Sequence, residues 1–75
     1  MPRQYVIENG DVDNRWLYKV ENGRGENVGT TLFYHPSIQD AMTFSKADAV
    51  AFAKRWRARA WAVKAGQPVS QVWPV

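Results

Sequence analysis

The chain of 75 residues contains no cysteine. This absence excludes disulfides, thiolate zinc sites and cysteine nucleophiles, and small cysteine-free domains are more typical of a reducing cytoplasm than of secreted scaffolds. Long apolar runs are also missing, and the opening MPRQYVIENG lacks the apolar centre of a signal peptide. We therefore expect a protein of the cytoplasm with no membrane partner.

Histidine is scarce as well, because His35 is the single example. A catalytic centre needs a nucleophile, a base or a metal held beside an orienting partner. No second histidine, cysteine or serine–acid pair accompanies His35 in the sequence. We therefore expect no enzymatic activity, no catalytic residue, no metal site and no cofactor.

Aromatic residues and cations are the features that the chain does have. Four tryptophans, three tyrosines and three phenylalanines can bury large surfaces in a chain of this length, which predicts a single domain over residues 1–75. The formal net charge is +3, and most cations lie in the second half of the chain. Such asymmetry is compatible with an anionic partner.

One segment, residues 45–64, has the only long helical pattern. Ser45 is a suitable N-cap, and Asp48 follows at the position of a capping box. Alanines fill the interior, while Gly66 and Pro68 are predicted to stop the helix. The sequence therefore predicts one long helix over these residues.

At about 100° per residue, this helix would present three faces. Phe52 and Trp56 anchor a stripe that we expect to face the core. A line of small residues forms a second face, and it is either a contact between helices of a homodimer or simply a set of good helix formers: Ala47, Ala51, Ala58 and Ala62. The third face places four cations around one tryptophan, and its members are the candidate binding residues: Lys46, Lys54, Arg57, Trp61 and Lys64.

Strand patterns surround this segment. Alternation and β-type composition predict strands over 4–8, 15–21, 30–34 and 69–73, a short strand at 42–44 and one helical turn at 37–41. In the second strand, Trp16, Tyr18 and Val20 are predicted to share one side, and residues 22–25 to form a hairpin tip. Together these patterns predict an α+β domain in which an antiparallel sheet of four to five short strands packs against one long helix.

Three stretches, YVIENG, RWLYKVENG and AMTFSKADAVAFAKR, resemble small proteins that bacteriophages and mobile elements encode. Proteins of this kind with known roles include anti-CRISPR proteins and other inhibitors of host defence. The resemblance implies a non-catalytic inhibitor that binds and occludes a host complex. Many anti-CRISPR proteins are acidic and imitate DNA, whereas this chain is basic, which implies an acidic protein surface or a nucleic acid as its target.

Two partners account for the candidate residues. Tryptophan and arginine are the favoured anchors of protein interfaces, which supports a host protein or ribonucleoprotein complex. Lysine and arginine also contact phosphates, and an interleaved indole can stack on a base, which supports a nucleic-acid-binding accessory protein instead. The sequence leaves both open, together with the choice between a monomer and a homodimer.

Overall fold

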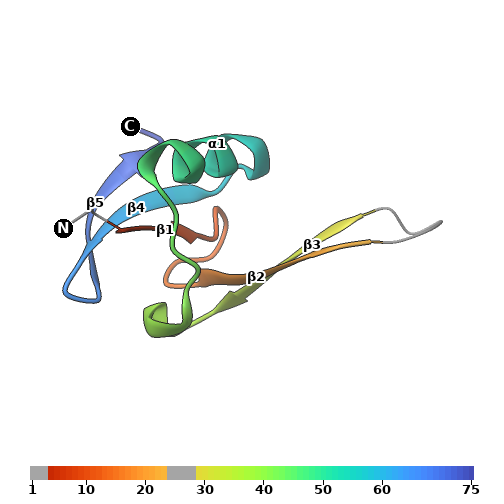
Figure 1. Ribbon diagram of the computed structural model, residues 1–75, viewed down its shortest axis with the longest axis horizontal. Helices are drawn as coiled ribbons and strands as arrows, with labels where there is room; N and C mark the ends of the chain where they lie inside the picture. The colour runs from red at the N-terminus through yellow and green to blue at the C-terminus, as the bar shows by residue number, and fades with distance from the viewer. Residues whose placement is uncertain (1–3, 24–28) are drawn as a thin grey trace.

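The structure, a computed structural model, describes residues 4–23 and 29–75 (Figure 1). Residues 24 and 25 of the predicted hairpin tip lie outside the described part. The elements follow the order β1 (Gln4–Glu8), β2 (Trp16–Asn22), β3 (Thr30–His35), the 3-10 turn η1 (Ile38–Asp40), α1 (Lys46–Trp56), β4 (Arg59–Lys64) and β5 (Gln67–Trp73).

The strands form one antiparallel sheet in the order β3-β2-β1-β4-β5. The helix α1 lies along one side of β1, β4 and β5, and the β2–β3 hairpin projects away from this body (Figure 1). This arrangement confirms the predicted α+β class with an antiparallel sheet and one helix. No helix in the described ranges is both long and apolar enough to cross a membrane.

The hairpin projects because β1 and β2 meet only where Glu8 pairs with Trp16. Beyond that pair the strands separate, and the segment leading into α1 enters the gap. Tyr5 and Phe44 form an isolated antiparallel bridge, and the Met42 N–H donates to the Leu17 carbonyl at 2.9 Å. The predicted short strand at 42–44 is therefore reduced to one bridge, and the segment bonds to β1 through Phe44 and to β2 through Met42.

The helix α1 begins as the sequence predicts and ends eight residues early. The Ser45 hydroxyl accepts a hydrogen bond from the Asp48 N–H at 3.2 Å, which confirms the N-cap. Arg57 then adopts a left-handed conformation with φ 55°, and the Ala58 N–H closes the last turn on the Ala53 carbonyl at 2.9 Å. Residues 59–64, predicted as helix, form β4 instead. Their run RARAWAV from position 57 alternates with the period of a strand, and this alternation prevails over the helix propensity of alanine.

The predicted helix stop is a hairpin turn. Ala65 and Gly66 both have positive φ, 52° and 74°, as the turns that join antiparallel strands through two residues require. Lys64 pairs with Gln67 across this turn. Gly66 therefore reverses a β-hairpin and does not end a helix.

The core lies between α1 and the sheet, and alanines dominate the contact. Ala49 and Ala53 of α1 are the buried residues of the helix, and they meet small residues of the sheet side. The other members of this cluster are Tyr5, Ile7, Leu17, Ala58, Ala60 and Ala62. Small side chains on both layers let the helix backbone approach the sheet closely.

The predictions about the helix faces are confirmed only in part. Phe52 is half-buried and packs against the core as predicted, and Trp56 is half-buried beside it with the ring centroids 6.3 Å apart, but the fully buried residues of α1 are Ala49 and Ala53. The predicted alanine line for a homodimer does not exist, because Ala58 and Ala62 are buried under α1.

A β-bulge changes the facing of side chains in β2. The register with β3 shifts between Leu17 and Lys19, so that Leu17 and Val20 both pack against the helix-side core. Trp16, Tyr18 and Val20 therefore do not share one side, as the simple alternation predicted. A bulge inserts one extra residue into a strand, and the period of two is lost at that point.

Candidate functional site

The end of α1 carries three cations that are neighbours in the sequence of one tryptophan. Lys54, Arg55 and Arg57 are exposed, and Trp56 between them is half-buried. The Arg55 guanidinium carbon lies 5.3 Å from the centroid of the Trp56 ring, within the range of a cation–π contact. We call these four residues the helix-end cluster.

The cluster has no acidic partner within residues 4–23 and 29–75, where no ion pair involves any of its three cations. Cations at this end of a helix interact favourably with the negative pole of the helix dipole. That interaction accounts for part of the clustering of cations, and three cations within four residues form a concentrated positive surface.

The backbone holds this surface in place. Arg57 sits at the left-handed position after the helix, where its N–H donates to the Ala53 carbonyl. The loop after β1 packs directly against it, because a Cβ at Gly10 would collide with the Arg57 carbonyl oxygen. Glycine at position 10 is therefore needed for the close approach of the two backbones.

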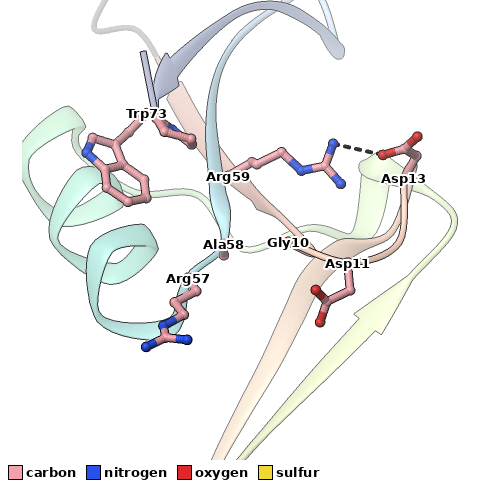
Figure 2. A pocket seen from close by; sticks show the side chains of 8 residues that line it. Gly10, Asp11, Asp13, Arg57, Ala58, Arg59 and Trp73 are labelled. Atoms are coloured by element: carbon pink, nitrogen blue, oxygen red, sulfur yellow. Dashed lines mark ion pairs between the residues drawn. The ribbon is translucent and has the colours of Figure 1, made fainter.

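An open depression of about 590 Å³ adjoins the cluster (Figure 2). The lining residues come from the loop after β1, the start of β4 and the end of β5, and they are Gly10, Asp11, Asp13, Arg57, Ala58, Arg59, Trp73 and Pro74. Figure 2 shows the guanidinium of Arg59 directed towards Asp13 and that of Arg57 directed to the opposite side.

Arg59 is occupied by a network within the protein. Its Nη1 lies 2.8 Å from Asp13 Oδ1 and 3.4 Å from Glu8 Oε1, while its Nε and Nη2 donate to the Asn9 carbonyl at 3.2 and 2.9 Å. These contacts tie the loop after β1 to β4. Arg59 therefore has a structural role. Of the two arginines that line this depression, Arg57 is the exposed one.

The five candidate binding residues do not form one face. Lys46 and Lys54 lie about two turns apart on α1 and roughly 80° apart around its axis, and Arg57 follows at the end of the helix. Trp61 lies on β4 beside Val6, on the sheet side opposite α1, and its Nε1–H donates to Glu8 Oε1 at 2.9 Å. Lys64 ends the same strand, about 16 Å beyond Arg59 at the usual rise per residue.

The structure therefore keeps Lys54 and Arg57 together, separates Trp61 and Lys64 from them, and adds Arg55. Arg55 lies off the face that a 20-residue helix would have formed, although the run KRWR shows the local charge density directly. No pattern in the sequence places Trp73 at the same depression as Arg57, because this placement depends on β5 folding beside β4.

The arrangement suits a ligand surface that carries carboxylates or phosphates. Arginine offers a planar set of donors that matches both groups in a bidentate manner, and lysine adds attraction at longer range. The indoles of Trp56 and Trp73 provide apolar area beside these charges. Such a combination of arginine and tryptophan is typical of residues that dominate binding energy at interfaces.

Comparison of the chain with protein-family models, with curated proteins and with solved structures found no match.

Proposed function

We propose that this protein is a non-catalytic binding protein whose helix-end cluster docks on a negatively charged surface. The observation that carries the proposal is the concentration of Lys54, Arg55 and Arg57 at one helix end, exposed and without ion-pair partners in the described part of the chain. The neighbouring indole of Trp56 would supply the desolvated anchor of the contact.

The conformation of Arg57 supports this role. Its φ of 55° belongs to the left-handed region, which costs a residue with a Cβ roughly 1–2 kcal/mol and usually selects glycine at a helix end. An arginine that tolerates such a backbone, at the rim of a depression, suggests that the guanidinium has a use beyond stability.

For the partner, we propose a protein or ribonucleoprotein complex of a bacterial defence system, which the protein would occlude. The resemblance to small phage-encoded proteins of the anti-CRISPR type points to that class. The positive charge of the cluster favours an acidic patch of the complex as the contact. In this view the protein acts in the cytoplasm of the host as an inhibitor.

Arg57→Gly tests the proposal without a loss of folding. Glycine suits the left-handed position, so the free energy of unfolding should stay the same or rise by up to about 1 kcal/mol. Arg55→Glu keeps the helix and reverses one charge. Each variant should weaken binding to the host complex by about 2 kcal/mol, a factor of roughly thirty. The complex is first captured from host lysate with the tagged protein and identified by mass spectrometry, and affinity is then measured with the purified complex alongside a phage-plaquing assay.

Lys64→Gln is the matched control, because it removes one positive charge from the far end of β4. Its affinity should remain close to that of the parent. If Lys64→Gln weakens binding as much as Arg57→Gly does, net charge matters and the cluster has no special role. Full inhibition of defence by folded Arg55→Glu and Arg57→Gly proteins would contradict the proposal.

Nucleic acid is the second candidate partner, favoured by the contact between the Arg55 guanidinium and the Trp56 indole beside Lys54. Phosphates would bind the cations, and a base could stack on the indole. Titration of duplex and single-stranded DNA at two salt concentrations tests this alternative, since the affinity must fall steeply as salt rises. Binding that is absent at low salt excludes it.

A further inference from the structure

The two edges of the sheet differ in how they are protected. An edge strand exposes unpaired N–H and C=O groups that can pair with another chain, and proteins usually block them with proline, charge or bulges. β5 has such a block: Pro68 lies within it, and its register with β4 shifts at two places. β3, with the sequence TTLFYH, contains no proline and no lysine, arginine or carboxylate.

The hydrogen bonding of the β2–β3 hairpin shows which groups of β3 are free. The Gly23 N–H donates to the Gly29 carbonyl, and hydrogen-bonded and non-hydrogen-bonded pairs alternate along an antiparallel ladder. The backbone groups of Thr31 and Phe33 therefore point towards β2. Those of Thr30, Leu32 and Tyr34 point away from the sheet, and β2 is the one strand that pairs with β3 in the described ranges.

We propose that β3 is a dimerisation strand that pairs with β3 of a second copy of this chain, antiparallel about a two-fold axis. The register that uses all the free groups places Leu32 opposite Leu32 of the second copy and Thr30 opposite Tyr34. Each of these residues offers one donor and one acceptor, so the pairing satisfies them reciprocally. The two sheets then become continuous across the axis.

Charge and side-chain character favour a second copy as the occupant. The strand contains no lysine, arginine or carboxylate, so self-pairing brings no such like charges together, and the residues that give the net charge of +3 lie elsewhere. Leu32 and Tyr34 are half-buried against the core, and pairing would extend this apolar layer across the axis. On the opposite side of β3, Phe33 contacts Tyr18, with ring centroids 6.2 Å apart. In the dimer Phe33 would add apolar contact area on that side.

The blocked edge explains why such association would stop at two copies. If both edges were open, strand pairing would continue from chain to chain. Because Pro68 and the register shifts protect β5, the β3 contact closes as an isologous dimer. This contact uses β3 and none of the residues of the helix-end cluster, so it does not depend on the proposed partner.

The test uses sedimentation equilibrium of the whole chain over a range of concentrations. The parent should dimerise with a dissociation constant that we expect to be roughly micromolar, because a single strand pair is a small interface. Thr30→Pro removes an N–H that points away from β2, and it should raise the dissociation constant about tenfold or more, because two symmetry-related hydrogen bonds are lost. Thr30→Ala is the matched control, since it loses the same side chain, keeps the N–H and should dimerise like the parent.

The absence of cysteine allows a second measurement. Leu32→Cys should form a disulfide-linked dimer on mild oxidation, because the two copies of this residue face each other across the axis. Val69→Cys, on the exposed part of β5, should not. A parent that stays monomeric at every concentration, a Thr30→Pro protein that dimerises like the parent, or preferential cross-linking through Val69→Cys would each overturn the proposal.

Discussion

The two sides of the sheet are buried by different means. On the helix side, Ile7 and the alanines of β4 lie under α1 in an apolar layer. On the other side, which α1 does not cover, Glu8 is only 4% exposed and is held by polar contacts. Adjacent residues of β1 therefore reach similar burial, one in a packed core and the other in a hydrogen-bonded network.

The polar side is stabilised because the network leaves no buried group unpaired. Glu8 Oε1 accepts from the Trp61 indole N–H at 2.9 Å, and Glu8 Oε2 accepts from the Asn14 N–H at 2.8 Å. Arg59 supplies the opposite charge and continues to Asp13. A buried carboxylate is tolerated when its charge is paired and its lone pairs are satisfied. The comparison shows that the two sides of β1 are covered differently. The helix α1 covers one side, and on the other side hydrogen bonds and ion pairs with the loop after β1 take the place of a second helix.

Ile7→Ala should have the largest effect on stability. Ile7 is fully buried, and removal of such a side chain costs about 2–5 kcal/mol through lost apolar burial and the cavity that remains. That loss is a large part of the stability of a domain of this size. Urea unfolding followed by circular dichroism measures it.

Val12→Ala is the control for this change, because Val12 is an exposed apolar residue of the loop after β1. Its effect should stay within about 0.5 kcal/mol. An Ile7→Ala protein as stable as the Val12→Ala protein would show that the layer under α1 is not the main source of stability.

Glu8→Gln should have an intermediate effect and act on the polar side. The amide keeps the shape of the side chain, loses the charge opposite Arg59 and cannot accept at both positions. Leaving a buried donor without its acceptor costs about 1–3 kcal/mol. The same change should alter the fluorescence of Trp61, whose indole N–H is bonded to Glu8.

Glu21→Gln separates this network from surface charge. Glu21 pairs with Lys19 at 2.7 Å, but both side chains are 53% exposed, and exposed ion pairs contribute little to stability. We expect a change below about 0.5 kcal/mol. If Glu8→Gln is equally mild, the side opposite α1 is held by apolar contacts of Val6 and Trp16 and the network is secondary.

Local patterns predict much of this fold. The first strand is predicted with its observed bounds, and the N-cap at Ser45 is correct, because both depend on residues adjacent in the sequence. The end of α1 is mispredicted, because the alanines of β4 have the same high helix propensity as those of α1. In residues 57–63 the alanines leave room for α1 to pack over the strand. Their role there depends on tertiary packing and not on helix propensity.

The candidate site is predicted less well for the same reason. Lys54 and Arg57 remain neighbours because they are close in the chain, whereas Trp61 and Lys64 depend on a helix that ends at Trp56. The association of Arg57 with Gly10 and Trp73 joins three distant segments. Patterns of period 3.6 or 2 describe single elements and contain no information on such pairings.

The smallest expected effect on stability is the pH dependence that Tyr34 contributes. This residue pairs with Leu17 of β2, on the helix side of the sheet. Burial and, to a lesser extent, the negative charge of Asp11 raise the pKa of its phenol above the ordinary tyrosine value. The folded state therefore favours the neutral phenol. This contribution is complete below the unfolded pKa of about 10, and it is lost as the pH rises through the higher pKa of the folded state. Unfolding free energies measured on both sides of that pH should decline less steeply for Tyr34→Phe than for the parent, with Asp11→Asn between them. Equal alkaline slopes for the parent and Tyr34→Phe would mean that the phenol is as well hydrated in the fold as in the unfolded chain, and that the apolar layer ends before β3.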